Sequence, residues 1–278
     1  MLFRAHAVTM VYDIGRASKD GRTVNDYVTW LNLTLRLPIT FTVFLDPKID
    51  ASQIKLKPGD NLVQMSFDEL YPNRWRDRVT AICVDGHNIK AKDDLTYRLP
   101  AYALVQFAKF DVLSRSKTYQ PDATHVLWID AGISRFFDTP PEKVFFDYDY
   151  FSHLAAASTA SLFLAITPRL AIHLREKSEA TYVGTCERLA TGEMFMIRAD
   201  QSETVAHRVY DYVEQQWLVQ NLWDNEQVAL GEILSREPTF ATILDGKQQA
   251  SFLKLLFPLK RHRIARAFDG LIEKIRAF

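Results

Sequence analysis

Asp130 is the side chain whose place in the sequence most suggests chemistry. It directly follows the apolar run 126–129 (VLWI), which is typical of a buried strand, and it precedes Ala131 and Gly132. A charge at the end of a buried strand is costly unless it is paired, and glycine lets a ligand approach the backbone closely. Because ligands of open α/β sheets bind at the carboxyl ends of strands, we expect Asp130 to bind a ligand. The alternative is that Asp130 caps whatever follows the strand.

Two arginines follow the ends of expected strands in the same way. Arg16 ends the segment 13–16 (DIGR), and Arg135 ends the segment 130–135 (DAGISR). Guanidinium groups match the geometry of phosphate oxygens, so this pair favours a phosphate-bearing ligand. Taken singly, each arginine could instead form a surface salt bridge or remain solvated. A third polar segment, 191–193 (TGE), precedes a later expected strand.

A rival metal motif occurs at Asp147 and Asp149. These residues form a D-x-D pair, which can hold a divalent cation that bridges two phosphates. The pair lies in FFDYDYF, after a proline-rich loop at 139–141, and no expected strand leads into it. So short a motif often arises by chance. Asp130 is therefore the preferred metal-binding candidate.

The elements that must position these residues alternate between strands and helices. Expected strands cover 7–12, 39–45, 62–67, 126–129, 162–166, 193–197 and 240–244. Expected helices cover 24–36, 68–84, 95–119 with an interruption at Pro100, 168–177, 201–222 and 225–235. This alternation favours right-handed crossovers and a parallel sheet. We predict an α/β fold with a mostly parallel, doubly wound sheet, helices on both faces, and room for an antiparallel strand in the last third.

Several common classes of protein are disfavoured by what the sequence lacks. It has no G-x-G-x-x-G, G-x-x-x-x-G-K-[ST] or G-x-S-x-G motif, and its seven histidines do not pair at the spacing of a helical zinc site. Cys83 and Cys186 are far apart, which favours free thiols in a reducing compartment. The formal net charge of zero disfavours a dedicated nucleic-acid binder. With neither a signal peptide nor a transmembrane run apparent, we expect a cytoplasmic location.

The segments 12–16 (YDIGR) and above all 128–135 (WIDAGISR), with the helix that passes through Lys109, resemble the bacterial HtrL/YibB-type family. The resemblance extends from about Val8 to Phe240. That family is similar to the nucleotide-sugar glycosyltransferases of the GT-A fold, which is Rossmann-like. The resemblance implies a glycosyltransferase that uses a nucleotide-diphosphate sugar, such as a UDP sugar. Its acceptor would be a surface polysaccharide, a lipopolysaccharide or another lipid-linked glycan.

The resemblance also implies roles for individual residues. The donor nucleotide would lie on the DIGR segment, and the donor-binding residues would be Asp13, Ile14, Gly15, Arg16, Lys109, Asp130, Ala131, Gly132, Arg135, Thr191 and Gly192. Asp130 would be the ligand of a manganese or magnesium ion in the diphosphate-binding turn. Many GT-A enzymes carry a second aspartate where this chain has Gly132. Either metal dependence is lost here, or its other ligands lie elsewhere.

The acidic segment 224–227 (DNEQ) is similar to a stretch that such enzymes place near the acceptor. An inverting enzyme needs a carboxylate base to activate the acceptor hydroxyl, and Asp224 and Glu226 are the catalytic candidates. A retaining enzyme needs no base in that role, and both outcomes stay open. Asp224 is also expected to be the N-cap of the helix at 225–235.

The end of the chain differs in composition from the rest. We expect residues 1–250 to form the glycosyltransferase domain and residues 251–278 a basic, amphipathic helical tail. Residues 254–278 carry seven basic and two acidic side chains, a net charge of +5. Such a tail can pack on the domain, lie on the anionic inner face of a membrane, or contact nucleic acid.

Three functions remain open on the sequence alone. The leading hypothesis is a cytoplasmic glycosyltransferase that acts on a glycan or a lipid-linked acceptor. The second is a non-catalytic nucleotide-sugar binding protein on the same fold, motivated by Gly132 in place of an aspartate. The third keeps the transfer chemistry but has a modified nucleic-acid base as acceptor.

Overall fold

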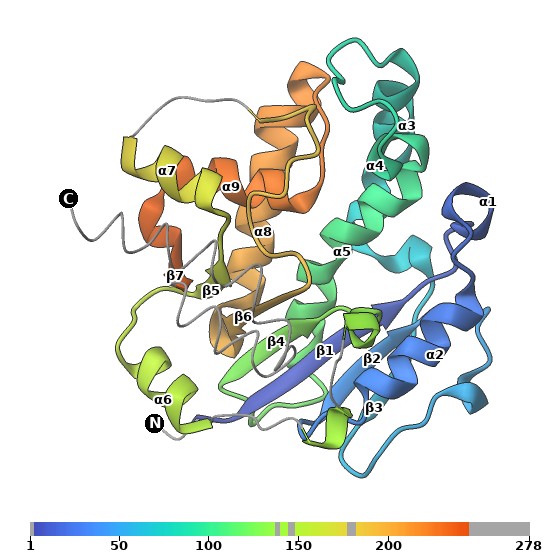
Figure 1. Ribbon diagram of the computed structural model, residues 1–278, viewed down its shortest axis with the longest axis vertical. Helices are drawn as coiled ribbons and strands as arrows, with labels where there is room; N and C mark the ends of the chain where they lie inside the picture. The colour runs from blue at the N-terminus through green and yellow to red at the C-terminus, as the bar shows by residue number, and fades with distance from the viewer. Residues whose placement is uncertain (1–2, 137–139, 144–147, 177–181, 245–278) are drawn as a thin grey trace.

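One sheet carries every strand in the part of the chain that the structure describes. The structure is a computed structural model, and it describes residues 3–136, 140–143, 148–176 and 182–244. The strand order is β3-β2-β1-β4-β6-β5-β7 (Figure 1). The strands are β1 (Ala5–Val11), β2 (Phe41–Leu45), β3 (Asn61–Gln64), β4 (His125–Ile129), β5 (Leu162–Ala165), β6 (Met194–Arg198) and β7 (Ala241–Leu244). Only β6 is antiparallel to its neighbours, β4 and β5. The predicted mostly parallel α/β sheet is confirmed.

Helices cover both faces of this sheet, as expected. Alternate residues of β1 enter two separate cores, with Val8 and Met10 in one and Ala7 and Val11 in the other. Strands that are buried on both faces need apolar residues at nearly every position, which explains their continuous apolar runs. The first core also takes side chains from α3 (Arg76–Asp85), α5 (Pro100–Ser116), α8 (Ser202–Tyr212) and α9 (Glu226–Arg236). The second core takes side chains from α2 (Val24–Thr34) and α6 (Tyr148–Ala156).

Several elements differ from the expected ones. Residues 68–84 do not form one helix: short 3-10 segments at Phe67–Glu69 and Tyr71–Trp75 precede α3, because Pro72 supplies no amide hydrogen for a longer helix. The expected strand at 62–67 ends at Gln64, since Ser66 caps the first of these segments. Helix α6 was not expected at all.

Other helices agree with the expected pattern. The helix at 95–119 is broken at Leu99 into α4 (Leu95–Arg98) and α5, next to Pro100 as predicted. Helix α8 continues through a π-helical segment, Val213–Trp217, and a 3-10 segment, Leu218–Gln220. Helix α7 (Pro168–Glu176) matches the helix expected at 168–177, whereas the short α1 (Ala17–Asp20) was not expected.

The order of the strands creates a crevice between β1 and β4. The chain runs from β1 to β2 and β3 on one side, and β4 pairs with β1 on the other side. The carboxyl ends of β1 and β4 therefore meet where the strand order reverses, which is where α/β sheets bind ligands. Because β6 is antiparallel, its first residue, Met194, pairs with Ile129 at the end of β4. The segment that precedes β6 thus reaches the same edge.

Some predictions fall on residues that the structure does not describe. Asp147 and the predicted tail at 251–278 lie outside the described residues, and the division of the chain at residue 250 stays a prediction. Among the described helices, none has both the length and the apolar character needed to cross a bilayer.

Candidate functional site

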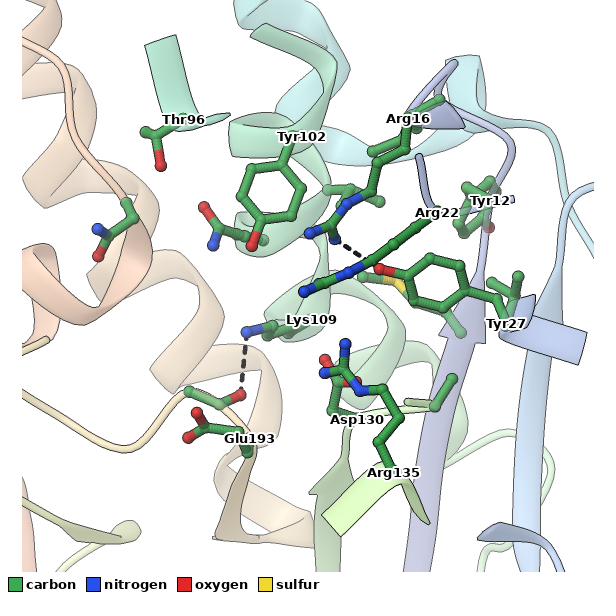
Figure 2. A pocket seen from close by; sticks show the side chains of 18 of the residues that line it. Tyr12, Arg16, Arg22, Tyr27, Thr96, Tyr102, Lys109, Asp130, Arg135 and Glu193 are labelled. Atoms are coloured by element: carbon green, nitrogen blue, oxygen red, sulfur yellow. Dashed lines mark hydrogen bonds between the residues drawn. The ribbon is translucent and has the colours of Figure 1, made fainter. Parts of the chain in front are cut away.

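A cavity of about 480 Å³ opens at this edge of the sheet. Its walls are the ends of β1 and β4, one face of α5, the segment before β6 and the start of α9 (Figure 2). The volume falls in the range of small-molecule sites. The predicted residues that line it are Asp13, Ile14, Arg16, Lys109, Asp130, Ala131, Arg135 and Gly192. Gly15, Gly132, Thr191, Asp224 and Glu226 do not line it.

Five cationic side chains line the cavity: Arg16, Arg22, Lys109, Arg135 and Arg188. In Figure 2, the side chains of Arg16 and Arg22 enter the pocket from one side and that of Arg135 from another. Four carboxylates, those of Asp13, Asp94, Asp130 and Glu193, also line the cavity. The cavity therefore carries a concentrated group of guanidinium charges, which suits a polyanionic ligand.

Arg16 is held in place by its neighbours. Its Nε and Nη2 atoms contact the carboxylate of Asp20 at 2.9 and 2.8 Å, and Nη1 donates to the hydroxyl of Tyr27 at 2.5 Å. The guanidinium carbon also lies 4.5 Å from the ring centre of Tyr102. Gly15 permits the turn before Arg16, because its φ of 74° lies in the left-handed region. Gly15 is therefore a turn residue, and Arg16 is presented to the cavity in a fixed orientation.

Asp130 begins a tight turn and also faces the cavity. Its Oδ1 accepts the amide hydrogen of Gly132 at 2.8 Å, so the capping alternative is correct for that oxygen. No residue in the described part of the chain donates a hydrogen bond to its Oδ2. Arg135 Nε donates to the carbonyl oxygen of Gly132 at 2.7 Å, which folds the guanidinium back over the turn.

Gly132 lies between these two charged side chains. A Cβ atom at this position would lie 3.2 Å from Asp130 Oδ1 and 3.3 Å from Arg135 Nε. Contacts this short would force a neighbouring side chain to move. Arg135 therefore occupies the space into which a second carboxylate at position 132 would extend.

Lys109 is buried and binds the backbone of the segment that precedes β6. Its ammonium group pairs with Glu226, whose side chain is fully buried, and donates to the carbonyl oxygen of Gly192 at 3.0 Å. Trp128 Nε1 donates to the same carbonyl at 3.1 Å. Burial raises the pKa of Glu226, and the ammonium group of Lys109 opposes this rise. Removing either partner would leave an uncompensated buried charge.

Asp224 is also fully buried and holds the backbone at Thr185 and Cys186. Its Oδ2 accepts the amide hydrogens of Thr185 and Cys186 at 2.9 and 3.0 Å, and its Oδ1 accepts that of Asn225 at 2.7 Å. Burial raises the pKa of Asp224 to about 6. The prediction that Asp224 caps α9 is wrong. Asn225 is the N-cap, because its side chain accepts the amide hydrogens of Gln227 and Val228 at 2.9 and 3.1 Å.

Several residues of the cavity were not predicted as individual site residues, although Glu193 and Gln227 belong to the segments 191–193 and 224–227 that were singled out from the sequence. Arg22, Arg188, Glu193, Tyr102 and Gln227 all line it. A usable signal existed for Tyr102, which shares one face of α5 with Lys109 seven residues later. Glu193 belongs to the polar TGE segment that leads into β6. Arg22 and Arg188 lie in connecting segments, where periodicity gives no signal.

A divalent cation fits this site only with help from a ligand. Within residues 3–136, 140–143, 148–176 and 182–244, no group of three or more His, Cys, Asp or Glu side chains could hold a metal ion. Magnesium, however, is often held by one or two carboxylates together with substrate phosphates. Asp130 has a carboxylate oxygen available for such shared binding.

Comparisons with known proteins do not assign the site, since no family model matches the chain and no curated protein matches it. The chemistry of the cavity must therefore be inferred from its own side chains.

Proposed function

We propose that the chain is a glycosyltransferase of GT-A-like fold that binds a nucleotide-diphosphate sugar in this cavity. The observation that carries the proposal is the convergence of Arg16, Arg22 and Arg135 on a cavity of about 480 Å³ at the reversal point of the sheet. A diphosphate carries the charge that such a group of guanidinium side chains neutralises. The resemblance of the YDIGR and WIDAGISR segments to a glycosyltransferase-like family supports the same proposal.

The cavity has two chemically different parts, which suggests how the donor lies in it. The three arginines and Asp130 would receive the diphosphate, with the nucleoside toward Asp13 and the ring of Tyr102. In Figure 2, Glu193 is drawn apart from these arginines, next to the carbonyl that Lys109 contacts. Gln227 adjoins Gly192, since a Cβ on that glycine would lie 2.6 Å from its Nε2. The sugar would lie on this carboxylate- and amide-lined side.

The chemistry of sugar transfer matches this division. As the bond between the anomeric carbon and the diphosphate breaks, negative charge develops on the leaving phosphate oxygen. Arginines fixed beside that oxygen stabilise the charge without having to reorganise. Asp130 would be the protein ligand of a manganese or magnesium ion, and such an ion would supply further neutralisation of the diphosphate charge. The acceptor would be a hydroxyl group of a glycan or a lipid-linked glycan in the cytoplasm.

A second candidate is a protein that binds nucleotide sugars without turning them over. The observation that favours it is that Asp224 and Glu226, the two acids predicted to be catalytic, are both fully buried. Asp224 accepts hydrogen bonds from three backbone amides, and Glu226 forms an ion pair with Lys109. Binding of a nucleotide sugar without hydrolysis or transfer would support this alternative.

The proposed function is tested by nucleotide binding. Thermal melting is measured with uridine, guanosine, cytidine and thymidine diphosphates, with and without manganese, because a ligand that binds only the folded state raises Tm. We expect at least one of them to raise Tm. In Arg135→Ala we expect its affinity to fall about 10- to 100-fold, since a hydrogen bond to a charged group contributes about 1.5–3 kcal/mol.

Arg4→Ala is the matched control, because Arg4 is an exposed arginine at the opposite end of β1 and does not line the cavity. It is expected to bind the nucleotide as the unaltered protein does. If none of the four diphosphates changes Tm, or if Arg135→Ala binds normally, the proposed donor site is wrong.

A further inference from the structure

We infer that Glu193 is the general base of the proposed transfer and that the transfer inverts the configuration at the anomeric carbon. The inference rests on the proposed function and goes beyond it by naming the proton acceptor and the stereochemistry. It reassigns the catalytic role predicted for Asp224 and Glu226, which become positioning residues.

The first step is to compare the four carboxylates that line the cavity. Asp13 accepts the amide hydrogen of Gly15 at 3.1 Å, and Asp94 accepts that of Thr96 at 2.9 Å as the N-cap of α4. Asp130 accepts that of Gly132. Each of these three carboxylates thus has one oxygen engaged by a nearby backbone amide. Glu193, by contrast, makes no side-chain hydrogen bond or ion pair with any residue in the described part of the chain. Its carboxylate is therefore available to accept a proton from a ligand.

The second step is that the backbone around Glu193 is fixed on both sides. The carbonyl oxygen of the preceding residue, Gly192, accepts hydrogen bonds from Lys109 and Trp128. The carbonyl oxygen of Glu193 itself accepts the amide hydrogen of Asp130 at 2.9 Å. A catalytic group must be held close to its productive geometry by rigid neighbours, and this arrangement provides such support.

The third step is that the neighbouring buried acids support Glu193 indirectly. Glu226 holds the ammonium group of Lys109, which in turn holds the Gly192 carbonyl. A Cβ on Gly192 would lie 2.7 Å from Glu226 Oε1, so glycine is required for this close packing. Asp224, with three backbone amide donors, fixes the start of α9 and the backbone at Thr185 and Cys186. Because neither acid lines the cavity, neither can receive a proton from an acceptor that is bound there.

The reaction then balances as a single displacement. The oxygen of the acceptor hydroxyl forms a bond to the anomeric carbon, while its proton passes to the Glu193 carboxylate. The bond between the anomeric carbon and the diphosphate oxygen breaks, and the nucleoside diphosphate leaves with the electron pair. Attack from the side opposite the leaving group inverts the anomeric configuration. No oxidant or reductant is needed.

The experiment uses the full chain with water as acceptor, so that the natural acceptor need not be known. The probes are α-linked UDP-glucose, UDP-galactose, UDP-N-acetylglucosamine and GDP-mannose. Hydrolysis is followed by the release of nucleoside diphosphate, and proton NMR early in the reaction identifies the anomer of the released sugar before it equilibrates. Glu193→Gln and Glu193→Asp are compared with Glu203→Gln, a control on an exposed part of α8 outside the cavity. Nucleoside diphosphate binding is measured for each variant by thermal melting.

We expect the unaltered protein to release the β-anomer first. Glu193→Gln is expected to lower hydrolysis by about 100-fold or more, because general base catalysis contributes roughly 10²–10⁴ in rate. Glu193→Asp is expected to retain part of the activity, and all variants are expected to bind nucleoside diphosphate equally well. An α-anomer as first product, or normal hydrolysis by Glu193→Gln, would overturn the inference while leaving the donor site intact. If the unaltered protein neither binds nor hydrolyses any of the probes, the proposed function fails, and the inference fails with it.

Discussion

The backbone amide of Asp130 donates a hydrogen bond of 2.9 Å to the carbonyl oxygen of Glu193. This contact lies one residue beyond the last pair of the β4–β6 ladder, in which Ile129 faces Met194. Both side chains line the same cavity. The sheet thus places two acids from distant parts of the sequence at one edge, and main-chain pairing fixes their relative position. In the proposed transfer, Asp130, which follows β4, lies on the leaving-group side, and Glu193, which precedes β6, lies on the acceptor side.

Asp130→Asn is expected to separate the structural role of Asp130 from its proposed metal-binding role. The asparagine oxygen can still accept the amide hydrogen of Gly132, so Tm without ligand should change little. The substitution should remove the extra rise in Tm that manganese adds to a bound nucleoside diphosphate. The measurement is a melting series with nucleotide alone and with nucleotide plus manganese. An equal manganese effect in both proteins would show that Asp130 does not bind the cation.

The buried Lys109–Glu226 pair is expected to show strong coupling in a double-mutant cycle. Lys109→Met and Glu226→Gln should each lower the free energy of unfolding by about 3–5 kcal/mol, because each leaves its partner without a counterpart. The double variant should lose clearly less than the sum of the two single losses. Urea denaturation gives the free energy of unfolding of all four proteins. Strictly additive losses would mean that the pair does not interact as the structure indicates.

If the Lys109–Glu226 pair positions Glu193, removing the pair should lower kcat for donor hydrolysis. The double variant has no unpaired buried charge, because both charges are removed, and its Gly192 carbonyl no longer accepts a hydrogen bond from Lys109. We expect kcat for donor hydrolysis to fall while the affinity for nucleoside diphosphate stays within a few-fold of normal. A loss of binding that parallels the loss of kcat would indicate general damage to the cavity instead.

The apolar runs predicted most of the sheet because strands buried on both faces leave a strong local signal. The strand expected at 126–129 is β4, which begins one residue earlier, and the strand expected at 193–197 is β6, which is shifted by one residue at both ends. The polar residues after β1 and β4 follow from their position in the sequence. The break at Pro100 also follows from local chemistry. Helix α6, which follows the proline-rich loop, was not predicted, although its sequence is amphipathic.

The burial of Glu226 and Asp224 could not be predicted in the same way. Glu226 is compensated by Lys109, which lies 117 residues earlier in the sequence. Asp224 and Asn225 are both good capping residues, so local preference does not choose between them. The amide groups of Thr185 and Cys186 donate to the Asp224 carboxylate, so Asn225 is the residue that caps α9. Such contacts depend on the finished fold.

Asp224 is expected to make stability depend on pH in a defined direction. Its pKa rises on folding from its ordinary value of 3.8 to about 6, so the folded state binds the proton more tightly than the unfolded state. Its contribution is therefore fully present below pH 4 and is lost as the pH rises to about 6. The loss amounts to about 3 kcal/mol.

This dependence is isolated by comparing the unaltered protein with Asp224→Asn. The variant should be less stable at pH 4, because its side chain cannot accept all three amide hydrogens. The difference between the two proteins should shrink as the pH rises from 4 to 6, and the comparison cancels other titrating groups. Urea denaturation at several pH values measures the difference in the free energy of unfolding between the two proteins. A difference that grows with pH in favour of the unaltered protein would contradict the assignment.

Gly192 and Gly132 are expected to respond differently to alanine. A Cβ at Gly192 would approach Gln227 Nε2 and Glu226 Oε1 to 2.6 and 2.7 Å, and the second of these atoms is held in place by Lys109. A Cβ at Gly132 would come no closer than 3.2 Å to its neighbours. We expect Gly192→Ala to cost about 1–3 kcal/mol of stability, and Gly132→Ala to cost less. Thermal melting ranks the two, and the reverse order would contradict the packing described around Gly192.

The most direct test is where a nucleoside diphosphate binds in a crystal of the protein. Crystals soaked with the diphosphate that raises Tm most are expected to show its phosphate oxygens within hydrogen-bonding distance of at least two of Arg16, Arg22 and Arg135. The β-phosphate, to which the sugar is attached in a nucleotide-sugar donor, should face Glu193. A diphosphate bound on another surface, with the cavity between β1 and β4 left empty, would contradict the proposed donor site.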